Sequence, residues 1–220
     1  MFYPQFTTKW LKPTTATLQH LCLWADEFFG FYPKMLPMHF PQLKYLSLGR
    51  YSFAHDSQLN WILSHAATLQ ELYLYGCTML YEVWISKDKF HRCLLNEKEM
   101  EDGEGDYGPY YAYRYQKRWS DYFNEFRNKL VHLRHFRFGG SGYFNGCEQP
   151  FELEDEILVD LYTIRYTAFD YSQLGLYVPQ TEYGSLLLWP SLNNLEDAEA
   201  LLGLLKKTGQ DLWIQRNGTI

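Results

Sequence analysis

Four segments of this chain share one spacing of three apolar residues. The second apolar residue follows the first by three positions, and the third follows the second by two positions. The spacing begins at Leu18, Leu43, Leu69 and Leu133, and the first three starts lie 25 and 26 residues apart. Alternate side chains of a strand point to opposite faces, so the spaced apolar residues would all enter one core. The pattern is typical of the strand half of a leucine-rich repeat. It predicts an α/β fold, a short leucine-rich-repeat solenoid with a curved, mostly parallel sheet backed by helices and irregular returns.

The segments between the strands predict the return paths. Pro33, Pro37 and Pro41 exclude a regular helix from Asp26 to Pro41, so the first return should be irregular. After the second strand, Asp56 can cap a helix. An apolar stripe at helical spacing follows it, formed by Leu59, Ile62, Leu63 and Ala66.

The long interval before the fourth strand predicts an insertion at about 80–130 within a single leucine-rich-repeat-like domain, 1–220. Its first half holds six acids and one lysine at 97–106, which is typical of a mobile, solvated loop. Its second half becomes helical from Tyr113, and its apolar stripe should pack on the back of the repeats. The stripe consists of Trp119, Tyr122, Phe123, Phe126 and Leu130.

The last part of the chain predicts three further elements. Alternation from Arg165 to Tyr171 indicates another strand. Asn194 can cap a helix, and residues 212–214 can form a short closing strand. The expected inner face of that helix is Leu195, Ala198, Leu201, Leu202 and Leu205.

Composition narrows the class of protein. The net charge of −6 leaves no overall basic field that would attract nucleic acid. The four cysteines are widely spaced without a C-x-x-C pair, which favours a reduced protein over a disulfide framework. The beginning of the chain has no signal-peptide pattern, and no apolar run is long enough for a membrane helix. We therefore expect a cytoplasmic or nuclear protein that does not enter a membrane.

Several stretches are similar to those of a known family. The resemblance is carried by 40–49, 55–65, 69–74, 118–123 and 133–139, and it spans about residues 16–208. These stretches resemble the repeat region of fungal F-box-type leucine-rich-repeat proteins. The resemblance implies that the repeats hold a protein substrate, while an N-terminal F-box docks on the Skp-type adaptor of a ubiquitin ligase. Only 17 residues precede Leu18, so we expect no F-box in this sequence and adaptor binding only if one is present upstream.

The residues between the core leucines should point onto the concave face of the sheet. They form three predicted columns, and Trp, Tyr and Arg among them are the residue types that dominate binding at protein interfaces. The predicted partner-binding residues are Trp24, Tyr45, Tyr73, Tyr75, His135 and Arg137. The alternative is that these aromatic side chains only stack along the sheet and stiffen it.

Other motifs predict less. The G-x-G-x-x-G spacing at Gly103–Gly108 lies among acids that would repel a phosphate, so we expect no nucleotide cofactor. Residues 111–137 carry seven Lys or Arg against two acids among aromatic residues, which could form a nucleic-acid groove or a solvated basic helix face. The acids of 152–156 read as a surface turn, and His132 and His135 would face opposite sides, so no metal site is expected.

No zinc-protease, nucleophile-elbow or P-loop spacing occurs, and we expect neither a catalytic residue nor an enzyme. The sequence therefore predicts a protein–protein recognition module, by resemblance the substrate-receptor region of an F-box-type ubiquitin ligase subunit. Two alternatives stay open. One is a nucleic-acid-binding module that uses the basic aromatic helix, and the other is a truncated relative without activity.

Overall fold

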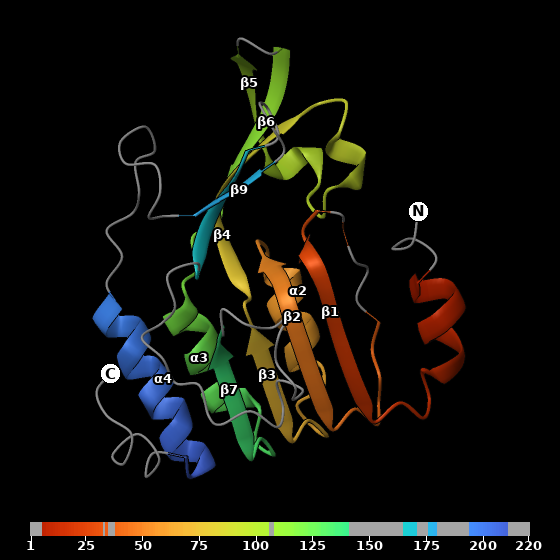
Figure 1. Ribbon diagram of the computed structural model, residues 1–220, viewed down its shortest axis with the longest axis vertical. Helices are drawn as coiled ribbons and strands as arrows, with labels where there is room; N and C mark the ends of the chain where they lie inside the picture. The colour runs from red at the N-terminus through yellow and green to blue at the C-terminus, as the bar shows by residue number, and fades with distance from the viewer. Residues whose placement is uncertain are drawn as a thin grey trace.

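The computed structural model describes residues 6–32, 34, 38–105, 108–140, 165–170, 176–179 and 194–210, and it has an α/β architecture built on one nine-stranded sheet. The sheet has two tiers that follow one another along the long axis, with the helices gathered beside the lower tier (Figure 1). The predicted strand at 212–214 and the acidic run at 152–156 lie outside the described residues.

The lower tier contains the four strands that the repeat spacing predicts. They are β1 (His20–Phe29), β2 (Tyr45–Phe53), β3 (Glu71–Tyr75) and β7 (His135–Gly139). All three pairings are parallel, and Leu21, Leu46, Leu72 and Phe136 lie side by side across the ladder. The predicted phase of the repeats is therefore confirmed. We call this unit the ladder.

The upper tier contains β4 (Thr78–Ser86), β5 (Glu101–Gly105), β6 (Gly108–Arg114), β8 (Tyr166–Asp170) and β9 (Leu176–Pro179). β4 pairs in parallel with the end of β2 and with β8, whereas β4–β6, β5–β6 and β8–β9 are antiparallel. The sheet is thus mixed and not mostly parallel as predicted, and the architecture as a whole is not clearly that of a leucine-rich-repeat solenoid. The physical reason is that only two residues separate β5 from β6 in the sequence, and so short a connection can join only antiparallel neighbours.

A crease in the backbone separates the two tiers. Arg50 in β2 and Gly76 between β3 and β4 have positive φ angles, 56° and 53°. Because Gly49 pairs with Tyr75, these two residues occupy the same level of the sheet. At that level β1 loses its regular pairing between Trp24 and Phe29. The chain therefore continues from β3 directly into β4 instead of closing a repeat through a helix.

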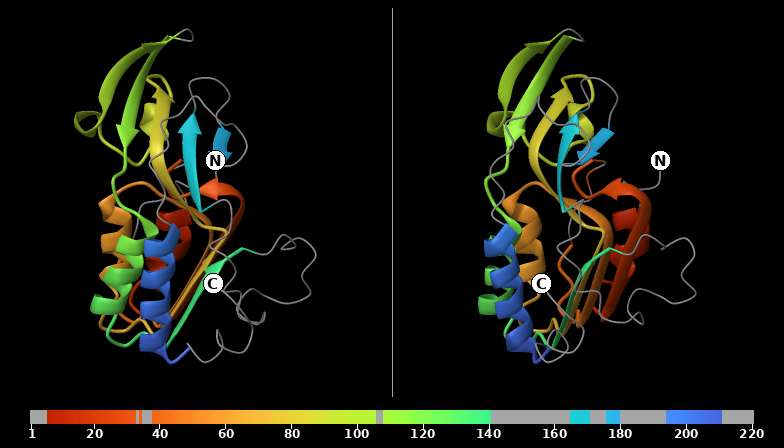
Figure 2. Two further views of the ribbon diagram at one scale, coloured as in Figure 1. Left: turned by 90° about the vertical axis from the view of Figure 1, so that its left-hand side faces the viewer. Right: turned by 60° about the vertical axis from the view of Figure 1, so that its left-hand side comes forward.

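Three helices cover one face of the ladder (Figure 2). The first, α2 (Asp56–Leu63), begins differently from the prediction, because His55 and not Asp56 is its N-cap. The Nδ1 atom of His55 accepts the backbone N–H of Ser57 at 3.1 Å, and Gln58 Oε1 accepts from the backbone N–H of His55 at 3.2 Å. Leu59 and Ile62 of the predicted inner stripe are buried.

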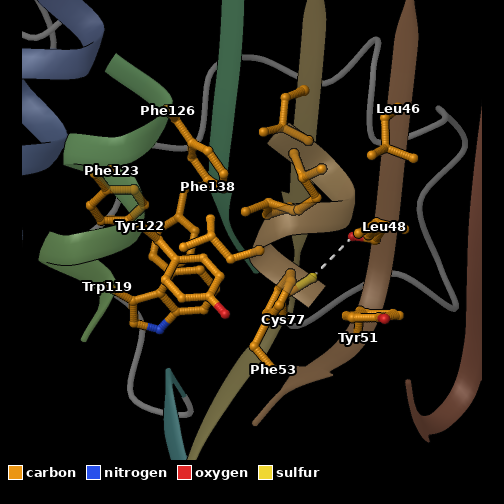
Figure 3. Packing of buried hydrophobic residues seen from close by; sticks show 14 of the residues in the cluster. Leu46, Leu48, Tyr51, Phe53, Cys77, Trp119, Tyr122, Phe123, Phe126 and Phe138 are labelled. Atoms are coloured by element: carbon orange, nitrogen blue, oxygen red, sulfur yellow. Dashed lines mark hydrogen bonds between the residues drawn. The ribbon is translucent and has the colours of Figure 1, made fainter. Parts of the chain in front are cut away.

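The second helix, α3 (Trp119–Lys129), starts six residues later than the predicted helical onset at Tyr113, which instead lies in β6. Its predicted stripe is confirmed, because all five residues of that stripe are fully buried. Trp119 lies edge-on to Phe138 at 4.6 Å between ring centroids, and Phe123 to the same ring at 5.0 Å. These rings fill the space between α3 and the leucines of the ladder (Figure 3).

The third helix, α4 (Asn194–Thr208), packs on α3 and on β7. Its inner face is rotated from the predicted one, because Leu195 is 64% exposed and Asp197 is buried. Asp197 accepts hydrogen bonds from the hydroxyl of Tyr166 at 2.8 Å and from the backbone N–H of Ser120 at 2.9 Å. These bonds draw a carboxylate inward, where an apolar residue would be expected from spacing alone.

The acidic segment is ordered into elements that the sequence did not predict. Residues predicted as a loop form the helical turn η4 (Glu97–Glu99) and the edge strand β5, which follow the turn η3 (Phe90–Arg92). Gly103 and Gly105 allow this, because Tyr110 of β6 lies where their side chains would be. The predicted loop is therefore wrong, although the acids themselves are exposed as expected.

Each end of the ladder is covered by side chains from outside it. At the β1 end, Leu11 joins the main core from the N-terminal turns η1 (Phe6–Leu11) and η2 (Lys12–Thr14). At the β7 end, the carboxamide of Gln210 replaces a neighbouring strand. Its Oε1 accepts from the N–H of Phe136 at 2.8 Å, and its Nε2 donates to the carbonyl of Phe136 at 3.0 Å.

Candidate interaction face

The candidate site is the face of the ladder opposite the three helices, which we call the ladder face. The strands expose it to the other side of the sheet because their leucines occupy the helix side, in the main core. Four of its aromatic residues form a separate cluster away from that core. In register, the ladder face carries His20, Tyr45, Glu71 and His135, then Cys22, Ser47, Tyr73 and Arg137, then Trp24, Gly49, Tyr75 and Gly139.

A continuous row of rings crosses all four strands of the ladder face. His20 stacks on Tyr45 at 5.4 Å between ring centroids, and Tyr45 lies 5.0 Å from Tyr73. Tyr73 in turn lies 5.3 Å from His135. Aromatic pairs at these separations stabilise each other beyond their buried area, so the row is a pre-organised surface.

Polar contacts hold the centre of this row in one geometry. The hydroxyl of Tyr73 donates to Glu71 Oε2 at 2.7 Å and lies 2.8 Å from Nδ1 of His135. The guanidinium of Arg137 lies over the Tyr73 ring, 5.7 Å from its centroid. A side chain that is fixed before binding loses little conformational entropy when a partner arrives.

The opposite corner of the ladder face is built around Gly49. A Cβ atom at this position would lie 1.9 Å from Cδ1 of Trp24, so the indole packs directly on the backbone of β2. Arg50 donates a hydrogen bond to the carbonyl of Asp26, and its guanidinium lies 5.8 Å from the Trp24 ring centroid. A side chain at position 49 would therefore clash with the Trp24 ring, so this packing requires glycine.

The six predicted binding residues are brought together on this face, but they differ in accessibility. Tyr73 and Tyr75 are each 3% exposed and Arg137 is 7% exposed, so these three are structural parts of the surface and not exposed anchors. Trp24, Tyr45 and His135 are half-buried. His20 and Cys22, which were not chosen as anchors, are exposed at the β1 end. Periodicity predicted the face of each residue, but it could not predict this depth.

Three of the seven basic residues of 111–137 are paired with acids. Arg114 Nε lies 3.0 Å from Glu82 Oε1, and Lys129 Nζ lies 2.7 Å from Glu125 Oε2. Lys117 lies 3.9 Å from Asp56. A groove for single-stranded nucleic acid needs cations that are free to meet phosphates. The arrangement therefore weakens the nucleic-acid alternative.

One cluster resembles a nucleophile with a base. His55 contacts Ser57 Oγ through Nδ1 at 2.8 Å and Glu99 Oε1 through Nε2 at 2.9 Å. The same Nδ1 atom also accepts the backbone N–H of Ser57, so its lone pair is already used to cap α2. These contacts tie η4 to the start of α2 and explain the cluster without catalysis.

The buried thiols are equally unsuited to chemistry. Burial raises the pKa of Cys77 to about 12 and that of Cys93 to about 12, so both thiols are protonated near neutral pH. Among the described residues there is no group of three or more histidine, cysteine or acidic side chains that could hold a metal ion.

The sequence pattern did not predict the polar side chains that hydrogen-bond to the sheet or to α3 from other parts of the chain. They include Gln210 on the edge of β7 and Asp197, whose pKa is raised because it is buried. Each makes side-chain hydrogen bonds with a residue more than 30 positions away in the chain. No local pattern carries that information.

Fold and site together define an α/β protein with a parallel ladder that presents an aromatic face. Comparisons with protein-family models, with curated proteins and with solved structures found no match. Within the described residues, no helix is long and apolar enough to cross a membrane.

Proposed function

We propose that this protein is a protein-recognition module and that its partner binds the ladder face. The observation that carries this proposal is the row of rings across four strands, from His20 through Tyr45 and Tyr73 to His135. A rigid strip of rings with polar tips supplies the large contact area and hydrogen-bonding groups that protein interfaces use.

The exposed end of the row of rings indicates where the partner makes its first contact. His20 and Cys22 are exposed on β1, and Tyr45 is half-buried beside them on β2. Tyr73 and Arg137 lie deeper and hold the rings in place. We therefore place the first contact of the partner over β1 and β2, with Trp24 and His135 at its margins.

We further propose that the partner is a substrate of a ubiquitin ligase, as in the F-box-type leucine-rich-repeat proteins that the sequence resembles. What supports this is the phase of the four strands, which agrees with the repeats of the quoted stretches. A Skp-type adaptor should bind only a chain that carries an F-box ahead of the ladder.

Site-specific crosslinking tests the location of the partner. A photo-reactive phenylalanine analogue placed at Tyr45 should crosslink a protein from a cell extract, whereas the same analogue at Val131 should not. Val131 is 66% exposed and follows α3, away from the ladder face, so it is a matched control.

In a pull-down without the crosslinker, substitution of His20 and Tyr45 by alanine should lower recovery of the protein identified by crosslinking at least about tenfold, because two contacts of a binding hot spot are lost. The melting temperature of the double variant checks that the ladder persists. Equal crosslinking at Tyr45 and Val131, or unchanged recovery with the double variant, would contradict the proposal.

A further inference from the structure

A second surface lies in the upper tier, at the outer edge of β5. Among the described strands, β5 is the last of its sheet and pairs only with β6. It extends away from the helices at the far end of the molecule (Figure 1). Both neighbours of Gly103 along the strand are exposed. An accessible strand edge presents backbone donors and acceptors to any chain that can add a further strand.

The hydrogen-bond pattern shows which backbone groups face outward. Lys87 N donates to the carbonyl of Pro109 at 3.2 Å, and Tyr115 N donates to the carbonyl of Tyr81 at 3.1 Å. Backbone bonds alternate along an antiparallel pair, so odd-numbered residues of β6 bond to β4 and even-numbered ones bond to β5. Gly103 is opposite Tyr110 and therefore bonds to β6. Asp102 and Glu104 consequently direct their N–H and C=O groups to the outer edge.

The two faces of β5 differ in chemistry. On one face are the carboxylates of Asp102 and Glu104, with Lys87 paired to Asp102 and lying 4.7 Å from the Tyr111 ring centroid. On the other face lies the exposed carboxylate of Glu101, followed by Gly103 and Gly105, which have no side chain and which the ring of Tyr110 contacts. The edge thus offers excess negative charge on one side, and on the other side an aromatic surface beside the carboxylate of Glu101.

The charge and the aromatic surface of this strand edge indicate which kind of chain can pair with it. A second copy of this chain would place acid against acid, which disfavours pairing. A strand with lysine or arginine at alternate positions would meet Asp102 and Glu104, and its intervening apolar side chains would meet Tyr110. We propose that the outer edge of β5 binds an extended segment of a partner protein in which basic and apolar residues alternate, and that it binds this segment as an added strand.

The direct test uses the full chain and a fluorescent peptide of alternating lysine and valine, with binding followed by fluorescence anisotropy. Its control is a peptide in which glutamate replaces every lysine. The lysine peptide should bind, the glutamate peptide should not, and an increase in ionic strength from about 0.05 M to about 0.5 M should weaken binding several-fold.

A proline substitution separates strand addition from simple charge attraction. Glu104→Pro removes the outward N–H without removing a bond to β6, because edge strands tolerate proline where the N–H faces outward. It should weaken peptide binding at least tenfold. Glu104→Gln keeps the N–H and removes only the charge, so it should weaken binding two- to five-fold. Glu97→Gln removes an exposed acid outside the edge and should leave the affinity unchanged.

Hydrogen exchange shows whether the hairpin is intact in these variants. The amide of Gly103 should stay protected in the wild type and in Glu104→Pro, and the amides of Asp102 and Glu104 should gain protection in the wild type when the lysine peptide binds. If Glu104→Pro unfolds the hairpin, Asp102→Pro takes its place as the test variant, because it removes the other outward N–H. The proposal is wrong if the wild type does not bind the lysine peptide. It is also wrong if a folded proline variant binds as well as the wild type, or if Glu97→Gln weakens binding as much as Glu104→Gln.

Discussion

The two tiers of the sheet are built by different rules. In the ladder, parallel strands repeat one leucine spacing, and the apolar residues of that spacing lie in the main core or pack against it. In the upper tier, β5 and β6 form an antiparallel hairpin, and a second, smaller cluster around Leu80, Val83 and Phe169 forms its core. Parallel strands need long crossovers, whereas antiparallel ones need only a tight turn. A periodic sequence can therefore describe the ladder but not the upper tier.

Side chains of α3 join the two tiers. Trp119 packs on Phe138 of the ladder, while its indole N–H donates to the carbonyl of Arg165 at 2.8 Å. Its backbone N–H donates to the hydroxyl of Tyr166 in the upper tier, also at 2.8 Å. The predictions below test how far the tiers depend on this junction and on each other.

The largest effect is expected for Trp119→Ala. The side chain is fully buried and contacts both tiers, so its loss should lower the free energy of unfolding by about 3–5 kcal/mol. Chemical denaturation measures this change. Trp10→Ala is the control, because Trp10 is 65% exposed and its loss should cost less than about 0.5 kcal/mol. Similar losses for both variants would contradict the role of the junction.

A matched pair of leucines compares the tiers directly. Leu72 in the ladder and Leu80 in the upper tier are both fully buried, and each change to alanine should lower the free energy of unfolding by about 2–5 kcal/mol. Because one sheet links the tiers, both variants should unfold in a single transition with an unchanged denaturant dependence. Two separate transitions in Leu80→Ala would show that the upper tier unfolds independently.

An intermediate effect should come from pH, through His65 behind the ladder. Burial and the nearby His39 lower the pKa of His65 from 6.5 to about 4. Its Nε2 accepts the backbone N–H of Phe40 at 3.1 Å and cannot do so when protonated. In the unfolded chain the imidazole binds a proton near pH 6.5, so the folded state loses stability as the pH falls from 6.5 towards 4.

Denaturation of the wild type and of His65→Gln at several pH values isolates this contribution. The difference in free energy of unfolding between the two proteins should change by no more than about 1.4 kcal/mol per pH unit between pH 6.5 and pH 4. It should be constant above pH 7. A difference that is flat from pH 7 to pH 4 would mean that the pKa of His65 is the same in the folded and the unfolded protein.

The smallest effect is expected at the crease. Gly76 has a φ of 53°, which an alanine adopts at a cost of about 1 kcal/mol. A Cβ atom would meet nothing closer than 3.7 Å, so Gly76→Ala should change stability through the backbone alone. Gly76→Asn should cost less, because asparagine tolerates this conformation better. Equal losses in the two variants would point to packing as the cause.

Much of the ladder could be predicted from local spacing. The register of Leu46, Leu72 and Phe136, the aromatic stripe of α3 and the face on which Tyr45 and Tyr73 lie all follow from periods of two and 3.6 residues. These features need only that apolar side chains leave water together.

Only the tertiary structure decided the rest. It turned the acidic segment into an edge strand because Tyr110 could cover Gly103, and it buried Asp197 because Tyr166 and Ser120 supply hydrogen bonds there. It also buried Tyr73 and Arg137 on a face that spacing marks as outward. Each outcome depends on a contact between residues that belong to different elements. A local pattern of apolar and polar positions does not predict the free energy of such a contact.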